Sequence, residues 1–539
     1  MRVLFFSPYA TWHYHGVLEI TWAHALAQRG AEVRFVTCDA QFPACDVWRE
    51  GLNPRHALSC VDCQQRTASL HRDMGMPYTW LGSYVPRPAR AAIRDWVEAL
   101  ERDELLGAHW KGRPVGQWAR SSAFYQFRMS RFDLDQPRVA AGVRAHVEGT
   151  AIAVEGLEAL LDEWRPDLVV LLNGRFFAHQ TAFALARERG IRVVTHERGL
   201  LKGTLRFADD ARIHDLGLYE TLWERWHDVP LEESELAWTR AVLADRRAGR
   251  NLPWESYSPP PQDEAEVRRR LGLGDRPLVV MFSSSDDESA AFDDRREGAF
   301  PDSLEWLNAT VALARELPEH DLVIRLHPNL TRNGTNRQTL ERIQRLRGEL
   351  PPNAHVVMPD DDVSSYTLAD LASAGLFYFS TLGLEMATRG QPVVAVARGW
   401  YGHCDFVRRV ERPADYAGAV RAALAAGPDP EVARRAWRFA HALYRELSIP
   451  FPLVVESPRH HGQPQFRDTA QLAPGAEPNL DRICRFLLGQ EPLLSSPEPH
   501  HRQRSEEAED RFLAAHLPHL GAGLPASPSP SPSPEQVSP

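Results

Sequence analysis

Hydrophobic and polar positions near the start of the chain follow two alternating patterns. A short apolar run at residues 2–7 precedes a segment with helical spacing of apolar residues at 17–28, and a second apolar run follows at 33–37. Gly30 stands directly after the helical segment, where a glycine commonly ends a helix. A strand, a helix and a strand in this order form a βαβ unit, so the sequence predicts a parallel sheet covered by helices.

The stretch from about residue 40 to 165 interrupts this alternation and is rich in Cys, Pro, Trp and Arg. Its apolar spacing predicts two long helices, at 88–106 and 137–163, which we interpret as a helical insertion in a first α/β domain. The alternation then resumes. The elements predicted there are strands at 168–172 and 191–195 and helices at 179–189 and about 216–248.

The second half of the chain shows the most regular pattern. Short apolar runs alternate with helical segments that begin near residues 303, 336, 364 and 382. This rhythm is typical of a doubly wound parallel sheet. The predicted strands lie at 277–282, 321–326, 355–358, 375–379 and 392–396.

The chain therefore belongs to the α/β class, and we expect two Rossmann-like domains joined by a linker. In such folds ligands bind in the crevice at the carboxyl ends of the strands, so we expect the site between the domains. The predicted division is a first domain at 1–250, a Pro-rich linker at 251–262, a second domain at 263–489 and a disordered Ser/Pro-rich tail at 490–539.

Composition and charge reduce the number of function classes that fit the chain. The 539 residues include 62 Lys and Arg against 72 Asp and Glu, a formal charge of −10, whereas nucleic-acid binders usually carry a basic domain or stripe. No apolar run approaches the roughly 18 residues of a membrane helix, and the first residues do not read as a signal peptide. We expect a cytoplasmic protein with at most peripheral contact to a membrane.

One predicted strand of the second half ends in the segment DLVIRLHPN. Side chains alternate along a strand, so Arg325 and His327 share a face, and Pro328 stops the strand directly after them. A buried cation inside the sheet would be costly, which places both residues at the carboxyl edge. A guanidinium fork and an imidazole suit a phosphate; alternatively, Arg325 pairs with a structural carboxylate.

Three further strand ends carry hydroxyl groups. Ser380 and Thr381 precede a predicted helix whose free amides can bind an anion, Gly383 lets the backbone approach a ligand, and Glu385 can accept from ribose hydroxyls or simply complement the helix dipole. The other hydroxyl positions predicted to bind the donor are Ser284, Ser364 and Ser365. Three aspartates at 360–362 precede a helix, where acidic residues are common, so we expect no catalytic metal.

The segments RLHPN, SSY and STLGLEMATRGQPVV, in this order, resemble the carboxyl-terminal domain of bacterial capsule and surface-polysaccharide glycosyltransferases with two Rossmann-like domains, the GT-B type. The His–Pro followed by a serine pair is similar to transferases that use CMP-activated sugars. The resemblance covers about residues 277–405. It implies that a set of side chains holds the nucleotide phosphate of the donor: His327, Ser364, Ser365, Ser380 and Thr381.

In the first half, the loop after the first strand contains His13, His15 and Glu19. A neutral imidazole there could take the proton of an acceptor hydroxyl, and we favour His15, beside Gly16. The segment VVTHERG places Glu197 at another strand end, as a second candidate base or as part of a structural ion pair with Arg198.

Four of the six cysteines lie within 26 residues: Cys38, Cys45, Cys60 and Cys63. Four thiols match a tetrahedral structural zinc site in number, although the first spacing is wider than in the usual zinc knuckle. Reduced or disulfide-linked thiols, or an iron–sulfur cluster, stay as alternatives. We expect no cofactor that takes part in catalysis.

The sequence thus favours a glycosyltransferase that moves a sugar from a nucleotide donor to a glycan or lipid-linked glycan acceptor. Three alternatives stay open: a nucleotide-sugar 2-epimerase, a CDP-glycerol-type glycerophosphotransferase and a non-enzymatic nucleotide-sugar-binding scaffold. The resemblance implies that the leaving phosphate is stabilised without a metal, by Arg325 and His327.

Overall fold

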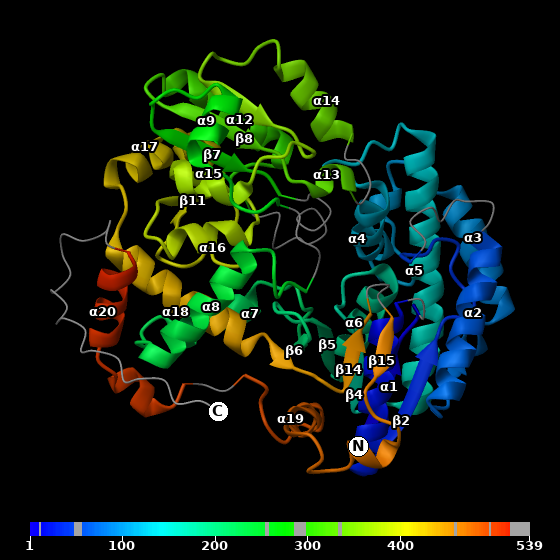
Figure 1. Cartoon of the computed structure of the whole chain (residues 1–539). Coiled ribbons are helices and arrows are strands. Elements are labelled where there is room, and N and C mark those ends of the chain that lie inside the picture. Colours follow the sequence, from blue (N-terminus) through cyan, green and yellow to red (C-terminus); the bar gives the residue numbers. More distant parts are fainter. Residues whose placement is uncertain are drawn as a thin grey trace.

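A computed structural model of the whole chain shows two α/β halves side by side (Figure 1). The N-terminal half is coloured from blue to teal and the C-terminal half from green to yellow. The structure describes all residues except 10–11, 48–55, 254–257, 285–297, 333–336, 458–460, 495–496 and 518–539.

The N-terminal half is built on a seven-stranded sheet with the order β13-β6-β5-β4-β1-β2-β3. Strands β1 to β5 run parallel, whereas β6 and β13 are antiparallel to their neighbours. The inner strands are continuous apolar runs, as expected for a parallel sheet that is buried on both faces. The strands are β1 Arg2–Phe6, β2 Glu32–Thr37, β3 Thr79–Trp80, β4 Leu168–Leu172, β5 Arg192–Arg198, β6 Thr204–Asp209 and β13 Ile449–Pro450.

Helices cover both faces of this sheet, and the predicted helical insertion is confirmed as α3, α4 and the long α5. The stretch predicted as one helix at 216–248 consists of two, α7 and α8, because Pro230 lies between them and cannot continue a helix. The helices are α1 His13–Gln28, α2 His56–Asp73, α3 Arg87–Ala99, α4 Val115–Phe127, α5 Pro137–Trp164, α6 Phe177–Glu188, α7 Gly217–Trp226 and α8 Glu233–Arg247.

The C-terminal half contains a six-stranded, all-parallel sheet with the order β12-β11-β10-β7-β8-β9. Its strands are β7 Leu278–Phe282, β8 Asp321–Arg325, β9 Ala354–Val357, β10 Ala372–Phe377, β11 Val393–Ala395 and β12 Arg408–Arg409. Its helices are α9 Glu264–Leu271, α12 Ser303–Glu316, α13 Asn329–Arg332, α14 Arg337–Leu346, α15 Ser365–Leu371, α16 Thr381–Ala387, α17 Tyr416–Ala426 and α18 Pro430–Glu446. The fold class, two Rossmann-like domains, is confirmed.

Strand order reverses at one point in each sheet. In the N-terminal sheet the chain proceeds outward from β1 to β3 and then outward in the other direction from β4, and the C-terminal sheet reverses in the same way between β7 and β10. Ligands of open α/β sheets bind outside the carboxyl ends of the strands at such reversal points. The topology therefore places the candidate site where these two edges face each other.

After α18 the chain returns to the N-terminal half, so the second domain does not extend to residue 489 as predicted. Strand β13 joins the first sheet, and the hairpin of β14 (Val454–Glu456) and β15 (Gly462–Pro464) packs against α1. Helix α19 (Pro478–Leu487) also contacts α1 and buries its apolar face in the core around β1. Figure 1 shows these orange segments beside the blue N-terminal elements.

Part of the segment 490–539, predicted as a disordered tail, is folded. A 3-10 turn at Pro499–Gln503 and helix α20 (Glu507–His516) are folded. Arg438 in α18 donates two hydrogen bonds to Glu509, at 2.9 and 2.7 Å, and Arg434 donates to Asp510 at 2.6 Å. These charge-assisted contacts explain why a polar segment is ordered. The Ser/Pro-rich part of the tail lies outside the described residues.

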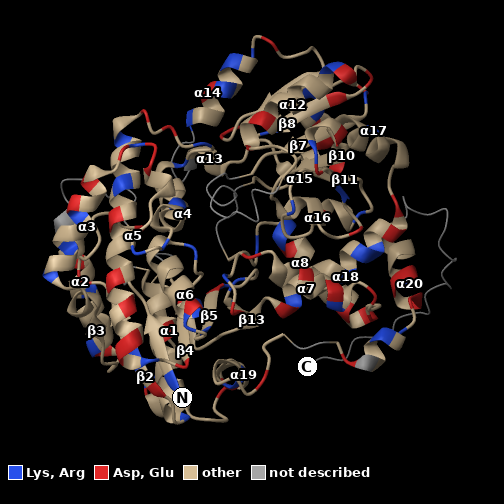
Figure 2. Cartoon of the chain, turned by 180° about the vertical axis from the view of Figure 1, so that it is seen from behind, with Lys and Arg blue, Asp and Glu red and all other residues tan. Residues whose placement is uncertain are grey.

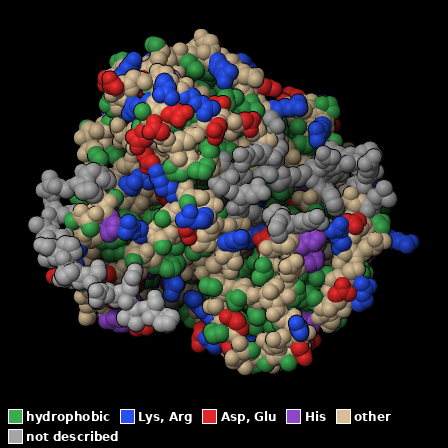
Figure 3. All heavy atoms as spheres, in the orientation of Figure 1, with side chains coloured by type: hydrophobic (Ala, Val, Ile, Leu, Met, Phe, Trp, Pro, Cys, Tyr) green, Lys and Arg blue, Asp and Glu red, His purple; other side chains and the backbone are tan. Residues whose placement is uncertain are grey.

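Charge is mixed over the surface. Lys and Arg alternate with Asp and Glu along the outer helices in Figure 2, and both signs are interspersed with hydrophobic side chains on the face in Figure 3. Among the described residues, no helix is long and apolar enough to cross a membrane.

Candidate functional site

A cleft of about 1170 Å³ lies between the two halves, at the carboxyl ends of the strands of both sheets. Its N-terminal wall consists of residues that follow β1, β4 and β5, together with the end of α4. Its C-terminal wall includes residues that follow β7, β8, β9, β10 and β11. The cleft thus joins the two points at which strand order reverses.

The lining of this cleft is strongly basic, in contrast to the whole chain. Among the residues that the structure describes, seven arginines line it, against two carboxylates, Glu197 and Glu385, and three histidines, His15, His214 and His327. A cavity lined by charges of one sign concentrates ligands of the opposite sign. The arginines are Arg128, Arg175, Arg198, Arg206, Arg246, Arg325 and Arg398.

His327 lies on the C-terminal wall two residues beyond β8, as predicted. Its backbone N–H donates to the Ser283 hydroxyl at 2.8 Å, and its Nδ1 accepts from the backbone N–H of Asn329 at 3.1 Å. Because Nδ1 accepts, the neutral ring carries its proton on Nε2. This tautomer provides an N–H donor in a cleft of positive charge, as a phosphate oxygen requires.

Arg325 lines the cleft, but its guanidinium also holds loops together. It donates to the carbonyl oxygen of Met358 at 2.5 Å and to the Ser365 hydroxyl at 3.3 Å. The side chain is only 2% exposed. Arg325 therefore positions Ser365 and contributes positive charge to the cleft. Its hydrogen bonds stay with the protein and do not pass to a ligand.

In each of the two serine pairs, Ser283–Ser284 and Ser364–Ser365, one residue lines the cleft and the other lies behind it. Ser284 bridges the Phe379 backbone, donating to its carbonyl at 2.7 Å and accepting from its N–H at 2.8 Å, whereas Ser283 lines the cleft. Ser364 is fully buried, caps α15 through the N–H of Thr367 and donates to the carbonyl of Pro259. Ser365 lines the cleft.

Ser380, Thr381 and Glu385 all line the cleft, as predicted. Ser380 caps α16, and Thr381 accepts from Arg246 at 3.1 Å. The space above Gly383 holds the hydroxyl of Tyr401, which a Cβ would meet at 2.2 Å, so this glycine makes room for a side chain and not for a ligand.

Arg246 in α8 is a site residue that the sequence did not indicate. Its guanidinium also donates to Glu385 at 3.3 Å and lies 5.0 Å from the ring of Tyr444. Burial and the neighbouring Glu385 raise the pKa of Tyr366 above its ordinary value, so this hydroxyl stays protonated. Because Arg246 donates to it, Glu385 forms an ion pair within the protein. This differs from the prediction that its carboxylate accepts from ribose hydroxyls.

The N-terminal wall centres on Arg198, at the end of β5. Its Nη1 donates to Nε2 of His15 at 2.7 Å, and its backbone N–H donates to Glu197 at 3.0 Å. Its Nε donates at 2.8 Å to Glu456, which the hairpin of β14 and β15 brings from the C-terminal segment. Glu456 is a second site residue that the sequence did not indicate.

His15 is placed poorly for the role of a base. Nε2 already accepts from Arg198, so the neutral ring carries its proton on Nδ1, which has no hydrogen-bond partner among the described residues. Burial and then the neighbouring Arg198 hold the pKa of His15 well below its ordinary value. The Nε2 lone pair is therefore engaged, and the ring is neutral.

Glu197 is better placed. Its Oε2 accepts from Nδ2 of Asn173 at 3.1 Å, and its Oε1 lies 3.4 Å from Nε2 of His15. Each carboxylate oxygen can accept a second hydrogen bond. His196, the preceding residue, is fully buried and pairs with Glu19 at 2.8 Å, so both support the wall from behind.

The four clustered cysteines belong to the N-terminal half, and Cys38 and Cys45 pack against its core. Cys38 follows β2, Cys45 lies in the next loop, and Cys60 and Cys63 lie on α2. Burial raises the pKa of Cys38 to about 12. In the part of the chain that the structure describes, no three His, Cys, Asp or Glu side chains form a group that could hold a metal, and the structural zinc site stays a prediction.

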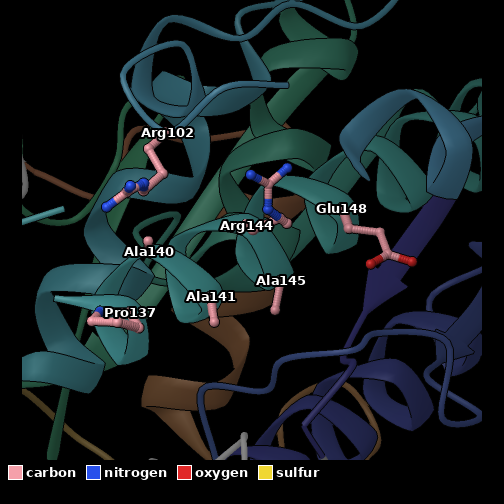
Figure 4. A pocket seen from close by; sticks show the side chains of 7 residues that line it. All are labelled: Arg102, Pro137, Ala140, Ala141, Arg144, Ala145 and Glu148. Atoms are coloured by element: carbon pink, nitrogen blue, oxygen red, sulfur yellow. The ribbon is translucent and has the colours of Figure 1, made fainter. Parts of the chain in front are cut away.

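A second hollow, of about 530 Å³, lies along α5 (Figure 4). Six of its seven lining residues belong to α5, and Arg144 among them donates to the carbonyl oxygens of Val97 and Leu100. This arginine ties the end of α3 to α5. The hollow is therefore part of the packing of the helical insertion.

Comparisons with known proteins give structural similarity only. No protein-family model and no curated protein matches the chain. A β-Kdo 2,4 transferase, KpsC of Thermosulfurimonas dismutans, is 14% identical over 56% of this chain and 86% of its own, with a TM-score of 0.34. The UDP-GlcNAc 2-epimerase of Neisseria meningitidis is 12% identical over 82% and 97%, with a TM-score of 0.26. The spinosyn rhamnosyltransferase SpnG is 13% identical over 82% and 95%, with a TM-score of 0.25. Sequence identities of 12–14% and TM-scores below 0.5 do not indicate the function of this chain, so the evidence for it is the cleft itself.

Proposed function

We propose that this chain is a glycosyltransferase that moves a sugar from a nucleotide donor to a surface-glycan acceptor, with a CMP-activated sugar as the first donor to test. The observation that carries the proposal is the basic cleft at the two reversal points, lined by seven arginines and two carboxylates in the described part of the chain. Such a cleft suits an anionic donor and leaves a separate wall for an acceptor.

The donor binds on the C-terminal wall. His327 donates from Nε2 to a phosphate oxygen, and the hydroxyls of Ser283, Ser365 and Thr381 add further hydrogen bonds. Arg246 and Arg325 supply positive charge beside the leaving phosphate. We propose that these groups stabilise it without a metal.

The acceptor binds on the N-terminal wall, and Glu197 is the proposed base. Its carboxylate takes the proton of the acceptor hydroxyl while the oxygen attacks the anomeric carbon of the donor. The new glycosidic bond forms as the bond from the anomeric carbon to the phosphate oxygen breaks. His15 keeps a supporting role, because Arg198 engages its Nε2.

The first test is thermal stabilisation of the purified protein by CMP, CDP, UDP, GDP and ADP. A ligand that binds only the native state adds about 2.7 kcal/mol at a hundred times its dissociation constant. We expect CMP to raise the melting temperature most. A panel without any stabilisation contradicts the proposal.

Turnover then separates the alternatives. Release of CMP from a CMP-sugar that depends on a glycan acceptor supports the transferase. A product formed from a UDP-sugar alone indicates a 2-epimerase, turnover of CDP-glycerol indicates a glycerophosphotransferase, and binding without turnover indicates a scaffold. The proposed setting is the cytoplasm, with peripheral membrane contact where the acceptor is lipid-linked.

A further inference from the structure

The turn after β4 contains two residues with positive φ, Asn173 at +32° and Gly174 at +73°. Strand β4 lies next to β1 in the N-terminal sheet, so this turn stands where strand order reverses. A residue other than glycine is uncommon in the left-handed region, although asparagine adopts it more readily than most. Backbone strain of this kind is concentrated at functional sites, and Asn173 lines the cleft.

Main-chain hydrogen bonds anchor this turn to its neighbours. The N–H of Asn173 donates to the carbonyl of His196 at 2.9 Å, which continues the pairing of β4 with β5. The carbonyl of Asn173 accepts from the N–H of Ile213 at 3.2 Å. The residue is only 4% exposed. Both main-chain polar groups of Asn173 are therefore satisfied without its side chain.

The side-chain amide of Asn173 joins the turn to the proposed base. Its Oδ1 accepts from the backbone N–H of Arg175 at 3.0 Å, and its Nδ2 donates to Oε2 of Glu197 at 3.1 Å. An amide oxygen only accepts and an amide nitrogen only donates, so the Arg175 N–H fixes which end of the amide faces Glu197. The amide cannot turn over without losing both hydrogen bonds.

The two oxygens of the Glu197 carboxylate have different surroundings. Oε1 accepts from the backbone N–H of Arg198 at 3.0 Å and lies 3.4 Å from Nε2 of His15 and 3.7 Å from Nη1 of Arg198. The other titratable groups nearby are Tyr14 on α1 and Glu456, which pairs with Arg198. Oε2 accepts from Asn173 and has a second lone pair.

We infer that Asn173 is a positioning residue for proton transfer, which holds Oε2 so that the second lone pair of this oxygen faces the acceptor hydroxyl. The inference rests on the proposed function and adds a residue that acts through the base. Two contacts, one at Oε1 and one at Oε2, define the orientation of the planar Glu197 carboxylate. Without the contact at Oε2 the carboxylate can rotate, and a small misplacement of a reacting group lowers kcat strongly.

Urea unfolding at pH 8 tests the contact without any ligand. The proteins are the parent, Asn173→Asp, Glu197→Gln and the double variant, in which donor and acceptor change places. Asn173→Asp should raise the equilibrium constant of unfolding at least about tenfold more in the parent than in the Glu197→Gln background, where an amide can donate to the new carboxylate. Equal effects in both backgrounds overturn the inference.

Turnover tests the positioning role, with CMP-Kdo and CMP-sialic acid as the first donors and release of CMP as the signal. Asn173→Gly removes the amide but keeps the backbone, because glycine adopts positive φ freely. We expect kcat to fall about 10–100-fold with the dissociation constant of CMP unchanged. Asn251→Gly is the matched control, because Asn251 has a φ of +52° and is not among the residues that line the cleft. A parental kcat in Asn173→Gly overturns the inference.

The pH profile of kcat separates positioning from a merely structural role. Asn173→Asp places a carboxyl oxygen where Nδ2 lies 3.1 Å from Glu197, and two adjacent carboxyl groups retain one proton between them to a higher pH. The acid limb of the profile should therefore move upward by at least about one pH unit. A fall in kcat that is equal at every pH would contradict the inference.

These results distinguish the inference from the proposed function. If CMP stabilises the protein and the parent transfers a sugar, but Asn173→Gly keeps the parental kcat, only the role of Asn173 is wrong. If no nucleotide stabilises the parent and it turns over no nucleotide sugar, the proposed function is overturned and the inference with it, even where the unfolding data show that Asn173 and Glu197 are coupled.

Discussion

The two walls of the cleft use their polar side chains differently. On the C-terminal wall, the hydrogen bonds of Ser284, Ser364 and Arg325 hold neighbouring loops, and Nδ1 of His327 accepts from the backbone N–H of Asn329. On the N-terminal wall, Glu197 accepts from the side chain of Asn173, whose Oδ1 in turn accepts from the backbone N–H of Arg175. Burying charge is costly unless it is paired or used. We therefore propose that the first wall binds the nucleotide and that the second wall takes up the proton.

The largest expected effect concerns the N-terminal wall. Glu197→Gln keeps the shape and the hydrogen bond to Asn173 but removes the base, so we expect kcat to fall by about 10²–10⁴-fold while the affinity for CMP stays unchanged. The measurement is acceptor-dependent release of CMP, with His15→Gln for comparison. If His15→Gln loses more activity than Glu197→Gln, the roles of these two residues are reversed.

The next effect concerns the C-terminal wall. His327→Ala removes the Nε2 donor, and we expect the dissociation constant of CMP to rise by about 10–100-fold, the range of one charge-assisted hydrogen bond. His320→Ala is the matched control, because His320 precedes the opposite end of β8 and is outside the cleft. Calorimetric titration with CMP measures both. Unchanged binding in His327→Ala would show that the donor does not lie on this wall.

Sequence predicted the sheets better than the site. Apolar runs such as 168–172 and 278–282 can only be buried strands, and they fix the carboxyl edges at which His327 and Glu197 lie. The pattern could not decide which serine of a pair faces the cleft, because either can cap the helix that follows. Ser364 and Ser284 were therefore predicted as ligands, although they bind the protein's own backbone.

Two site residues depend on long-range packing. Arg246 lies in the range that the sequence assigns to the first domain, yet α8 packs on the C-terminal half and places it beside Glu385. Glu456 follows the apolar residues 453–455, in the range that the sequence assigns to the second domain. A charged residue close after an apolar run is also the signal that indicates Glu197. The same signal indicates Glu456. Its partner Arg198 could not be inferred from spacing.

A smaller effect concerns stability: a buried, neutral histidine away from the cleft, His146, should make the protein less stable as the pH falls. Burial lowers the pKa of His146 to about 3, whereas an unfolded histidine titrates near 6.5. Below pH 6.5 the unfolded chain binds a proton that the folded chain does not, so stability falls as pH decreases toward 3. His146 should account for about 2 kcal/mol of the loss at pH 5 relative to pH 8.

Urea unfolding of the parent and of His146→Gln at both pH values measures this contribution. The variant should lose less stability on acidification than the parent, by that amount. An equal loss in both proteins contradicts the assignment of a neutral, buried imidazole. The opposing contribution of Asp46, whose pKa is raised to about 6, is present in both proteins and cancels in the comparison.

The smallest effect tests the division within the serine pair. Ser364→Ala removes the cap of α15 and should lower the free energy of unfolding by about 1 kcal/mol, with the affinity for CMP unchanged. Ser365→Ala, one residue further, should do the opposite, since its hydroxyl lines the cleft and its loss weakens CMP binding severalfold with little change in stability. Chemical unfolding measures the free energy of unfolding of each variant, and calorimetric titration measures its affinity for CMP. If both serines affect the same quantity, the C-terminal wall is not divided into one hydroxyl for the loop and one for the ligand, and the contrast with the N-terminal wall disappears.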